Sequence, residues 1–291
     1  MHEWPLVIYT LFVQISVGAY ITLINIDRLS FQSKQMLTKK AAVILQITIA
    51  VLSAAGMTAS FFHLGSPLHS INVLNNLGES WLSAEILFQM LFFTGVVLMT
   101  LLQWKDWHRK GDFRKTLHSI TRQIVGIVGV LLIIAMAKLY MLPTVPVWNQ
   151  PYTLISFIVT AFTLGPIALL MGYQTVERDI SASFSKVSAF VYKACSILLS
   201  IKLIFLIYLV TILGNLNNAG LKSFRLYTEK YHFWLILLIL ISVWVIILSA
   251  IHGWGEKRIV KRQMALFWIL LFVAAIIERS LFYATYARIG L

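Results

Sequence analysis

The sequence predicts an all-α integral membrane protein, a bundle of eight transmembrane helices that forms a single polytopic domain over residues 1–291. Charged residues make up 12% of the sequence and apolar residues 59%, whereas a soluble domain carries about 25% charged residues. Several apolar runs reach the roughly 20 residues that cross a hydrocarbon layer of about 30 Å. The segments between these runs are mostly short, so they leave no room for an extramembrane domain.

The first three spans have distinct ends. The first apolar run begins at Pro5 without a preceding basic residue and continues directly into a spanning helix, so no cleavable signal peptide is expected. The second span ends at His63, because the Gly-Ser-Pro sequence after it permits an αL cap and then stops the helix. The third carries Glu85 within its first turns.

The later spans carry two further features. Residues 143–148 separate the fourth span from the fifth and are expected to form an extended, uncharged linker, a rigid lip beside an outer pocket. Turn formation alone would also explain the two prolines of this segment. The sixth span contains Lys193 and Lys202, each of which either snorkels to the interface or pairs within that helix. The eight predicted spans are residues 5–26, 41–63, 82–103, 120–142, 152–173, 187–213, 233–252 and 263–287.

Topology follows from lysine and arginine, which concentrate in the cytoplasmic loops of membrane proteins. With the N-terminus outside, sixteen of the 24 Lys and Arg residues lie in inner loops and four lie within helices. Both termini are therefore predicted to be periplasmic. The net charge of +13 then reflects topology and contact with anionic lipid headgroups of the bilayer, and no nucleic-acid partner is expected. The four outer basic residues are Lys222, Arg225, Lys230 and Arg288.

His63 and Glu85 are predicted to lie at the same outer face, at the ends of two antiparallel neighbouring helices. A histidine, with an ordinary pKa of about 6.5, accepts a proton close to neutral pH. The two side chains can therefore exchange protons with a bound redox ligand and with water. Two plainer interpretations stay open: His63 is an interfacial histidine satisfied by a carbonyl, and Glu85 complements the N-terminus of its helix.

Three more charges lie within spans, where each charged group costs at least about 2.5–3.5 kcal/mol and usually faces the bundle interior. Glu278 and Arg279 are adjacent in sequence and point about 100° apart on a helix, whereas Arg279 and Tyr283 share a face. An interhelical ion pair between Lys138 and Glu278 is the structural interpretation. The functional one is that these charges line a headgroup pocket or close it toward a partner protein.

The metal-binding capacity of the protein is predicted to be low. A single cysteine, Cys195, excludes an intrachain disulfide and thiolate-held iron–sulfur or zinc centres. Two membrane haems would need four histidines, and the candidate pairs are His63 with His232 and His118 with His252. His118 and His252 fall at helix ends beside basic loops, where a solvated histidine is ordinary. Neither haem nor a metal is therefore expected.

Six motifs carry a resemblance to a known family. In this order along the whole sequence, they resemble the membrane anchor subunit of bacterial anaerobic dimethyl sulfoxide reductase and, more distantly, the membrane subunits of polysulfide and nitrite reductases. The block at 63–86 is the most specific. The motifs are His-Glu-Trp-Pro-Leu at 2–6, His-Leu-Gly-Ser-Pro at 63–67, Leu-Asn-Asn-Leu-Gly at 74–78, Leu-Ser-Ala-Glu-Ile at 82–86, Thr-Val-Pro-Val-Trp at 144–148 and Glu-Arg-Ser-Leu-Phe-Tyr at 278–283.

The resemblance implies a haem-free anchor in the bacterial inner membrane that oxidises menaquinol in anaerobic respiration. It implies two partners in a heterotrimer: an iron–sulfur subunit with [4Fe–4S] clusters, and a molybdopterin subunit that reduces the sulfoxide. The functional histidine and carboxylate of the family correspond to His63 and Glu85. The further residues expected to bind or position the quinol are Lys138, Tyr140, Arg279 and Tyr283.

Three other functions are weighed against this one. A related anchor could serve a polysulfide- or tetrathionate-type molybdoenzyme with the same quinol chemistry. A secondary transporter usually has helices broken near the midplane and an internal repeat, whereas the breaks here fall at helix ends. A purely structural anchor leaves the cost of the clustered ionisable residues unexplained.

Overall fold

The computed structural model describes residues 4–33, 38–62, 73, 75–106, 113–177, 182–255 and 260–290. Within them, eight helices are long and apolar enough to cross a membrane, which confirms the predicted bundle. Most of these helices extend several residues past the predicted spans at one or both ends, because helices continue beyond the apolar run that marks them. The spans are α1 (Trp4–Ser33), α2 (Lys39–Phe61), α3 (Trp81–Asp106), α4 (Phe113–Tyr140), α5 (Pro151–Val176), α6 (Ala182–Leu213), α8 (His232–Trp254) and α9 (Lys261–Ala284).

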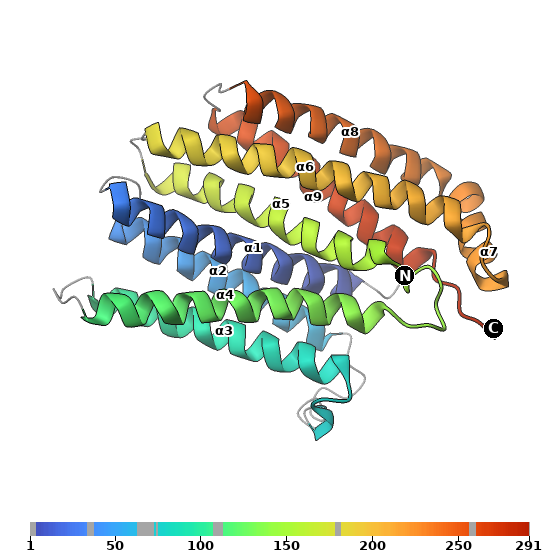
Figure 1. Ribbon diagram of the computed structural model, residues 1–291, viewed down its shortest axis with the longest axis horizontal. Coiled ribbons are helices and arrows are strands. Elements are labelled where there is room, and N and C mark those ends of the chain that lie inside the picture. The colour runs from blue at the N-terminus through green and yellow to red at the C-terminus, as the bar shows by residue number, and fades with distance from the viewer. Residues whose placement is uncertain are drawn as a thin grey trace.

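Helices α1 and α5 form the centre of the bundle (Figure 1). About three-quarters of the apolar window of α1 is buried, against less than a fifth for α8. The α1–α5 contact depends on two glycines: a Cβ atom on Gly18 would lie 1.9 Å from the carbonyl oxygen of Ala161, and one on Gly165 would lie 2.5 Å from the backbone nitrogen of Ala19. Small residues at such positions let two membrane helices approach closely.

The outer surface of the bundle is apolar. On α8, Phe233, Ile236, Leu240 and Trp244 are all exposed, although the helix has one of the highest mean hydropathies in the protein. An exposed apolar face is unfavourable in water and favourable in hydrocarbon. Helix α8 therefore faces lipid.

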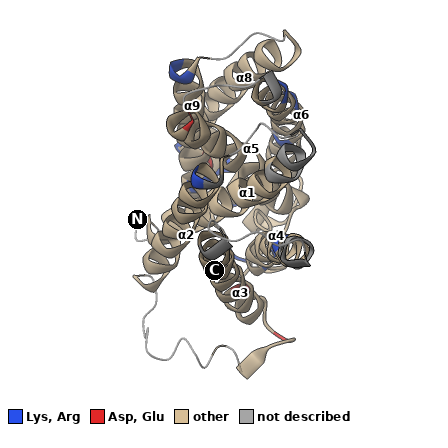
Figure 2. Cartoon of the chain, turned by 90° about the vertical axis from the view of Figure 1, so that its left-hand side faces the viewer, with Lys and Arg blue, Asp and Glu red and all other residues tan. Residues whose placement is uncertain are grey.

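Both termini lie at the same end of the bundle, beside α7 and the connection between α4 and α5 (Figure 1). Figure 2 looks onto the opposite end, where α2, α4, α6 and α9 begin. Basic residues lie within the first two turns of three of these helices, with Lys40 in α2, Lys186 in α6 and Lys261 in α9. The structure thus fixes which ends share a side, and the assignment of the terminal end to the periplasm remains a prediction from charge.

A short helix, α7 (Asn218–Arg225), and a π-helical turn, η2 (Leu226–Lys230), occupy what the sequence presents only as an outer loop. The side chain of Asn217 caps α7 by accepting a hydrogen bond from the Gly220 backbone at 3.0 Å. Tyr227 of η2 is buried, and this burial raises its pKa to about 12 although Thr285 hydrogen-bonds to it. A segment this short and polar carries no transmembrane signal, which is why it was missed.

The expectation of an extended linker at residues 143–148 is wrong. The backbone turns twice there, since the Val145 nitrogen donates to the Leu142 oxygen at 2.9 Å and the Trp148 nitrogen to the Val145 oxygen at 3.0 Å. Val145 and Val147 are buried against the ends of neighbouring helices. Burial of these apolar side chains favours a compact turn over an extended strand.

Candidate functional site

Glu85 lies in the first turns of α3 and is only 4% exposed. Its partner is Tyr9 of α1, whose hydroxyl donates a hydrogen bond to the Glu85 carboxylate. Nearby, the Ser83 hydroxyl donates to the carbonyl of Val73 at 2.6 Å and ties the preceding segment to the start of α3. The carboxylate is therefore held inside the bundle, near the end that carries the termini.

Two tyrosines meet close to this pair. The hydroxyls of Tyr140, at the end of α4, and Tyr283, in the last turn of α9, are 2.8 Å apart, and either can donate to the other. Tyr140 also interacts electrostatically with Glu85, and Tyr283 with Tyr9. Four oxygen-bearing side chains from four helices thus form one polar group.

Aromatic side chains fix the ring of Tyr140. Its ring centroid lies 5.5 Å from that of Trp148, 5.8 Å from Phe157 and 5.3 Å from Phe282. Trp148 stacks on Phe282 and donates its indole N–H to the Phe282 carbonyl at 2.8 Å. Close packing on all these sides leaves the Tyr140 ring one orientation, so its hydroxyl points in a defined direction.

Arg279 is buried one helical turn before Tyr283 and is 2% exposed. Its guanidinium group lies 3.8 Å from the ring centroid of Phe157, as in a cation–π contact. Its Nη2 atom donates to Oε1 of Gln14 on α1 at 3.5 Å. The Nε atom of Arg279 and the Nε2 atom of Gln14 have no hydrogen-bond partner. Two buried donors here are therefore available to an acceptor.

We call this group the six-residue site. It joins α1, α3, α4 and α9. It contains four of the residues predicted from the sequence and two that the sequence analysis missed. Gln14 could have been noticed as an amide in the middle of an apolar span, whereas a tyrosine near a membrane interface, such as Tyr9, gives no such signal. The members are Tyr9, Gln14, Glu85, Tyr140, Arg279 and Tyr283.

Two of the predicted site residues are not among these six. His63 lies outside the described residues, so its position relative to Glu85 stays a prediction. Lys138 is half-buried on α4, two residues before Tyr140, and the ion pair predicted between Lys138 and Glu278 is wrong. Glu278 is bound elsewhere, because it points away from the α9 face that carries Arg279 and Tyr283.

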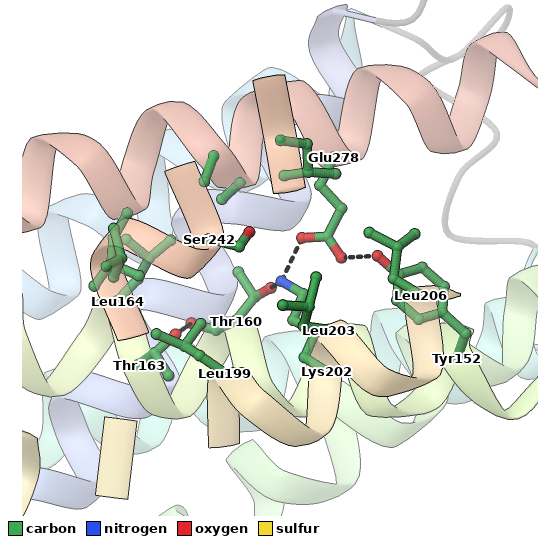
Figure 3. A pocket seen from close by; sticks show the side chains of 15 residues that line it. Tyr152, Thr160, Thr163, Leu164, Leu199, Lys202, Leu203, Leu206, Ser242 and Glu278 are labelled. Atoms are coloured by element: carbon green, nitrogen blue, oxygen red, sulfur yellow. Dashed lines mark hydrogen bonds and ion pairs between the residues drawn. The ribbon is translucent and has the colours of Figure 1, made fainter. Parts of the chain in front are cut away.

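Glu278 pairs instead with Lys202 of α6 (Figure 3). Its Oε1 atom also accepts hydrogen bonds from the hydroxyls of Tyr152 at 2.5 Å and Ser156 at 2.7 Å, both on α5. Lys202 in turn donates to the Thr160 hydroxyl at 3.0 Å. Lys202 therefore neither snorkels nor pairs within its own helix, and the ion pair links α6 to α9 with α5 between them.

The cavity beside this ion pair has a volume of about 30 Å³ and is bordered by α5, α6, α8 and α9. That space corresponds to roughly one water molecule, whereas small-molecule sites occupy about 300–1,000 Å³. The charges are paired, and the cavity is too small for a quinol ring or a transported solute. We therefore interpret the Lys202–Glu278 pair as a structural link.

The described histidines have ordinary partners. The Nδ1 atoms of His232 and His252 lie 2.9 Å and 2.7 Å from the backbone oxygens of Glu229 and Leu248. Lys193 lies over the ring of Trp254 at 5.0 Å. In the part of the protein that the structure describes, no group of three or more His, Cys, Asp or Glu residues could hold a metal ion.

Comparison with known proteins identifies the family. A family model described as the DMSO reductase anchor subunit (DmsC) matches residues 1–285. The chain belongs to this family. Because the match extends over nearly the whole sequence and eight apolar helices are present, the protein is a multi-pass protein of the bacterial inner membrane.

Individual relatives agree with the family match. The protein is 34% identical over 167 residues to anaerobic dimethyl sulfoxide reductase chain YnfH of Escherichia coli (strain K12), over 57% of this sequence and 56% of the relative. It is 32% identical over 175 residues to a second anaerobic dimethyl sulfoxide reductase subunit of the same organism, over 59% and 57%. An anaerobic dimethyl sulfoxide reductase subunit of Haemophilus influenzae is 30% identical over 171 residues, over 58% and 57%. These alignments span less than two-thirds of each relative.

Proposed function

We propose that this protein is the membrane anchor of an anaerobic dimethyl sulfoxide reductase complex and oxidises menaquinol for it. The electrons pass to an iron–sulfur subunit and from there to a molybdopterin subunit that reduces an S- or N-oxide. The family match and the names of the relatives support the anchor role. The single observation that supports quinol oxidation is the six-residue site, where a buried carboxylate lies beside hydroxyls and unpaired donors.

The site fits the chemistry of a quinol. A quinol hydroxyl donates a hydrogen bond to a carboxylate, and its oxygen accepts one from a cationic donor. Glu85 offers the acceptor, Arg279 offers an unpaired N–H, and the Tyr140–Tyr283 hydroxyl pair can do either. Oxygen-bearing groups of this kind are costly inside a membrane unless they find partners. A buried redox ligand with two hydroxyls supplies those partners.

Oxidation of menaquinol to menaquinone releases two electrons and two protons. Glu85, fixed by the Tyr9 hydroxyl, accepts a proton from one quinol hydroxyl. His63, which follows α2 in the sequence, is proposed to accept the other and to pass it to water. Arg279 donates to a ring oxygen and stabilises the negative charge that the conjugated ring gains as protons leave. The electrons leave to a cluster in the partner subunit, so the anchor itself needs no metal.

The proposal is tested with Glu85→Gln and His63→Ala in the whole complex. Both variants are expected to lose at least 90% of quinol-dependent sulfoxide reduction, because each removes a proton acceptor. Reduction driven by an artificial donor that feeds electrons directly to the soluble subunits stays at the wild-type rate, which shows that the complex is assembled. Full quinol turnover in both variants contradicts the proposal.

A further inference from the structure

The six-residue site has two levels along the bundle. Helix α1 runs away from the end with the termini, and α9 runs toward it (Figure 1). Gln14 follows Tyr9 by five residues and Arg279 precedes Tyr283 by four, so both lie deeper. At about 1.5 Å per residue, the Gln14–Arg279 contact is about 6–7.5 Å below the level of Glu85 and the tyrosines. That separation is comparable with the distance across one aromatic ring between para oxygens.

The deeper level consists of hydrogen-bond donors. Gln14 is fully buried, and its Oε1 atom already accepts from Arg279 at 3.5 Å. The opposite amide orientation would turn the NH₂ group of Gln14 toward the guanidinium, and two donors would then face each other. The contact with Arg279 therefore fixes the amide, and the Nε2 donor of Gln14 points to a different acceptor.

The lack of an acceptor for buried side-chain nitrogens is specific to the contact between Gln14 and Arg279. Elsewhere among the described residues, the unpartnered buried amide atoms are oxygens, on Gln46, Gln89, Gln103 and Gln174. The unpartnered nitrogens are Nε2 of Gln14 and Nε of Arg279, on two side chains that contact each other. A buried donor without a partner costs about 1–3 kcal/mol. Two such donors side by side indicate a ligand with an acceptor oxygen.

We propose that Gln14 and Arg279 together bind one ring oxygen of the quinone, while the Glu85 level faces the oxygen at the other end of the ring. This inference rests on the proposed function and adds Gln14 as a binding residue. Neither an amide nor a guanidinium is a base at neutral pH, so Gln14 and Arg279 remove no proton. Glu85 and His63 accept both protons of the quinol before the oxidised ring places a carbonyl oxygen on Gln14 and Arg279. A quinone carbonyl only accepts hydrogen bonds, so Gln14 and Arg279 favour the oxidised ring over the quinol.

The decisive variant is Gln14→Glu, measured in the whole complex. Glutamate has nearly the shape of glutamine and keeps the contact with Arg279 as an ion pair, but an acceptor oxygen replaces the free N–H donor. We expect the affinity for a quinone-analogue inhibitor to fall at least ten-fold and the KM for quinol to rise by less. Activity with the artificial donor is expected to be unchanged.

A second variant and a matched control separate binding from structure. Gln14→Met removes the amide without adding charge and is expected to weaken inhibitor binding to a similar extent. Gln46→Met removes another buried glutamine, on α2, and is expected to leave inhibitor affinity unchanged. Equal losses in the Gln14 and Gln46 variants would show a general effect of removing a buried amide and would overturn the inference.

The outcomes also separate this inference from the proposed function. If Gln14→Glu binds the inhibitor as tightly as the wild type while Glu85→Gln loses quinol turnover, Gln14 is not a quinone ligand and the proposed function stands. If Glu85→Gln and both Gln14 variants all keep quinol turnover and inhibitor binding, the proposed function fails together with the inference. Loss in both Gln14 variants, with Gln46→Met at the wild-type level, supports the inference.

Discussion

At the scale of single residues, the carboxylate of Glu85 depends on a partner from a distant part of the sequence. Tyr9 of α1 donates a hydrogen bond to this carboxylate. The bond fixes the position of the carboxylate and supplies one of the hydrogen bonds that it needs when buried. Hydrogen bonds that orient a catalytic group act on the rate more than on ligand affinity. Tyr9 is therefore a positioning residue in the proposed reaction.

Tyr9→Phe is expected to lower kcat for quinol oxidation about ten-fold, equivalent to about 1.4 kcal/mol, with a smaller change in KM. The matched control is Tyr20→Phe, which removes a fully buried tyrosine hydroxyl from the same helix. The Tyr20 hydroxyl lies 3.5 Å from the Arg122 carbonyl, remote from Glu85 in the bundle. Steady-state kinetics of both variants test this prediction. Equal kcat values in the two variants would show that Tyr9 has no specific role.

At the scale of helices, the buried charges of α9 divide between two functions. Arg279 faces α1 and the six-residue site, whereas its neighbour Glu278 faces α5 and α6 and binds Lys202. The helical rotation of about 100° per residue separates them. One turn of α9 thus contributes a proposed quinol-binding group on one face and an ion pair on another.

Removing one partner of that ion pair leaves an unpaired buried charge, which costs about 3–5 kcal/mol. Lys202→Met is therefore expected to lower the unfolding temperature in detergent markedly, and the double variant Lys202→Met with Glu278→Gln is expected to recover most of the loss. The control is Lys193→Met, on the same helix but against Trp254, which costs less than about 1 kcal/mol. A double variant as unstable as the single one would contradict a structural pair.

The contact between α1 and α5 determines the position of Tyr9 and Gln14, because both residues lie on α1. Gly18→Ala would put a methyl group 1.9 Å from the Ala161 carbonyl oxygen, so α1 must shift against α5. We expect lower yields of the assembled complex and at least a ten-fold loss of quinol turnover. Gly126→Ala is the control, because its methyl meets only side-chain atoms, Cδ1 of Ile24 at 3.1 Å and Cγ1 of Ile21 at 3.9 Å. Wild-type turnover in Gly18→Ala would show that this contact does not position the site.

At the scale of the whole molecule, charge is distributed unevenly between the two ends. The termini, α7 and the six-residue site lie at one end, and the helices that open with lysines start at the other (Figures 1 and 2). The positive-inside rule assigns the lysine-rich end to the cytoplasm. The quinol site, and with it the docking surface for the iron–sulfur subunit, is then proposed to face the periplasm.

Protease added to intact spheroplasts tests this orientation. The soluble subunits are expected to be digested without lysis, because they would be bound to the periplasmic end of the anchor. A cytoplasmic protein, followed in the same samples, is expected to survive until the cells are broken. Protection of the soluble subunits until lysis would place the docking surface on the cytoplasmic side.

The sequence alone determined the membrane bundle, its eight spans and the presence of both termini at one end. These properties depend only on local sequence, because the summed transfer free energy of about 20 consecutive residues decides whether a segment crosses the bilayer. It also indicated Glu85, Tyr140, Arg279 and Tyr283, because charged or motif-bearing residues stand out against an apolar background.

The tertiary structure decided which of these groups meet. Whether Glu278 pairs with Lys138 or with Lys202 depends on how each helix is rotated about its own axis. Packing sets that rotation through contacts such as Gly18 on Gly165, which no single span encodes. The partnership of Tyr9 with Glu85 has the same origin, since 76 residues separate two side chains that only the folded bundle brings together.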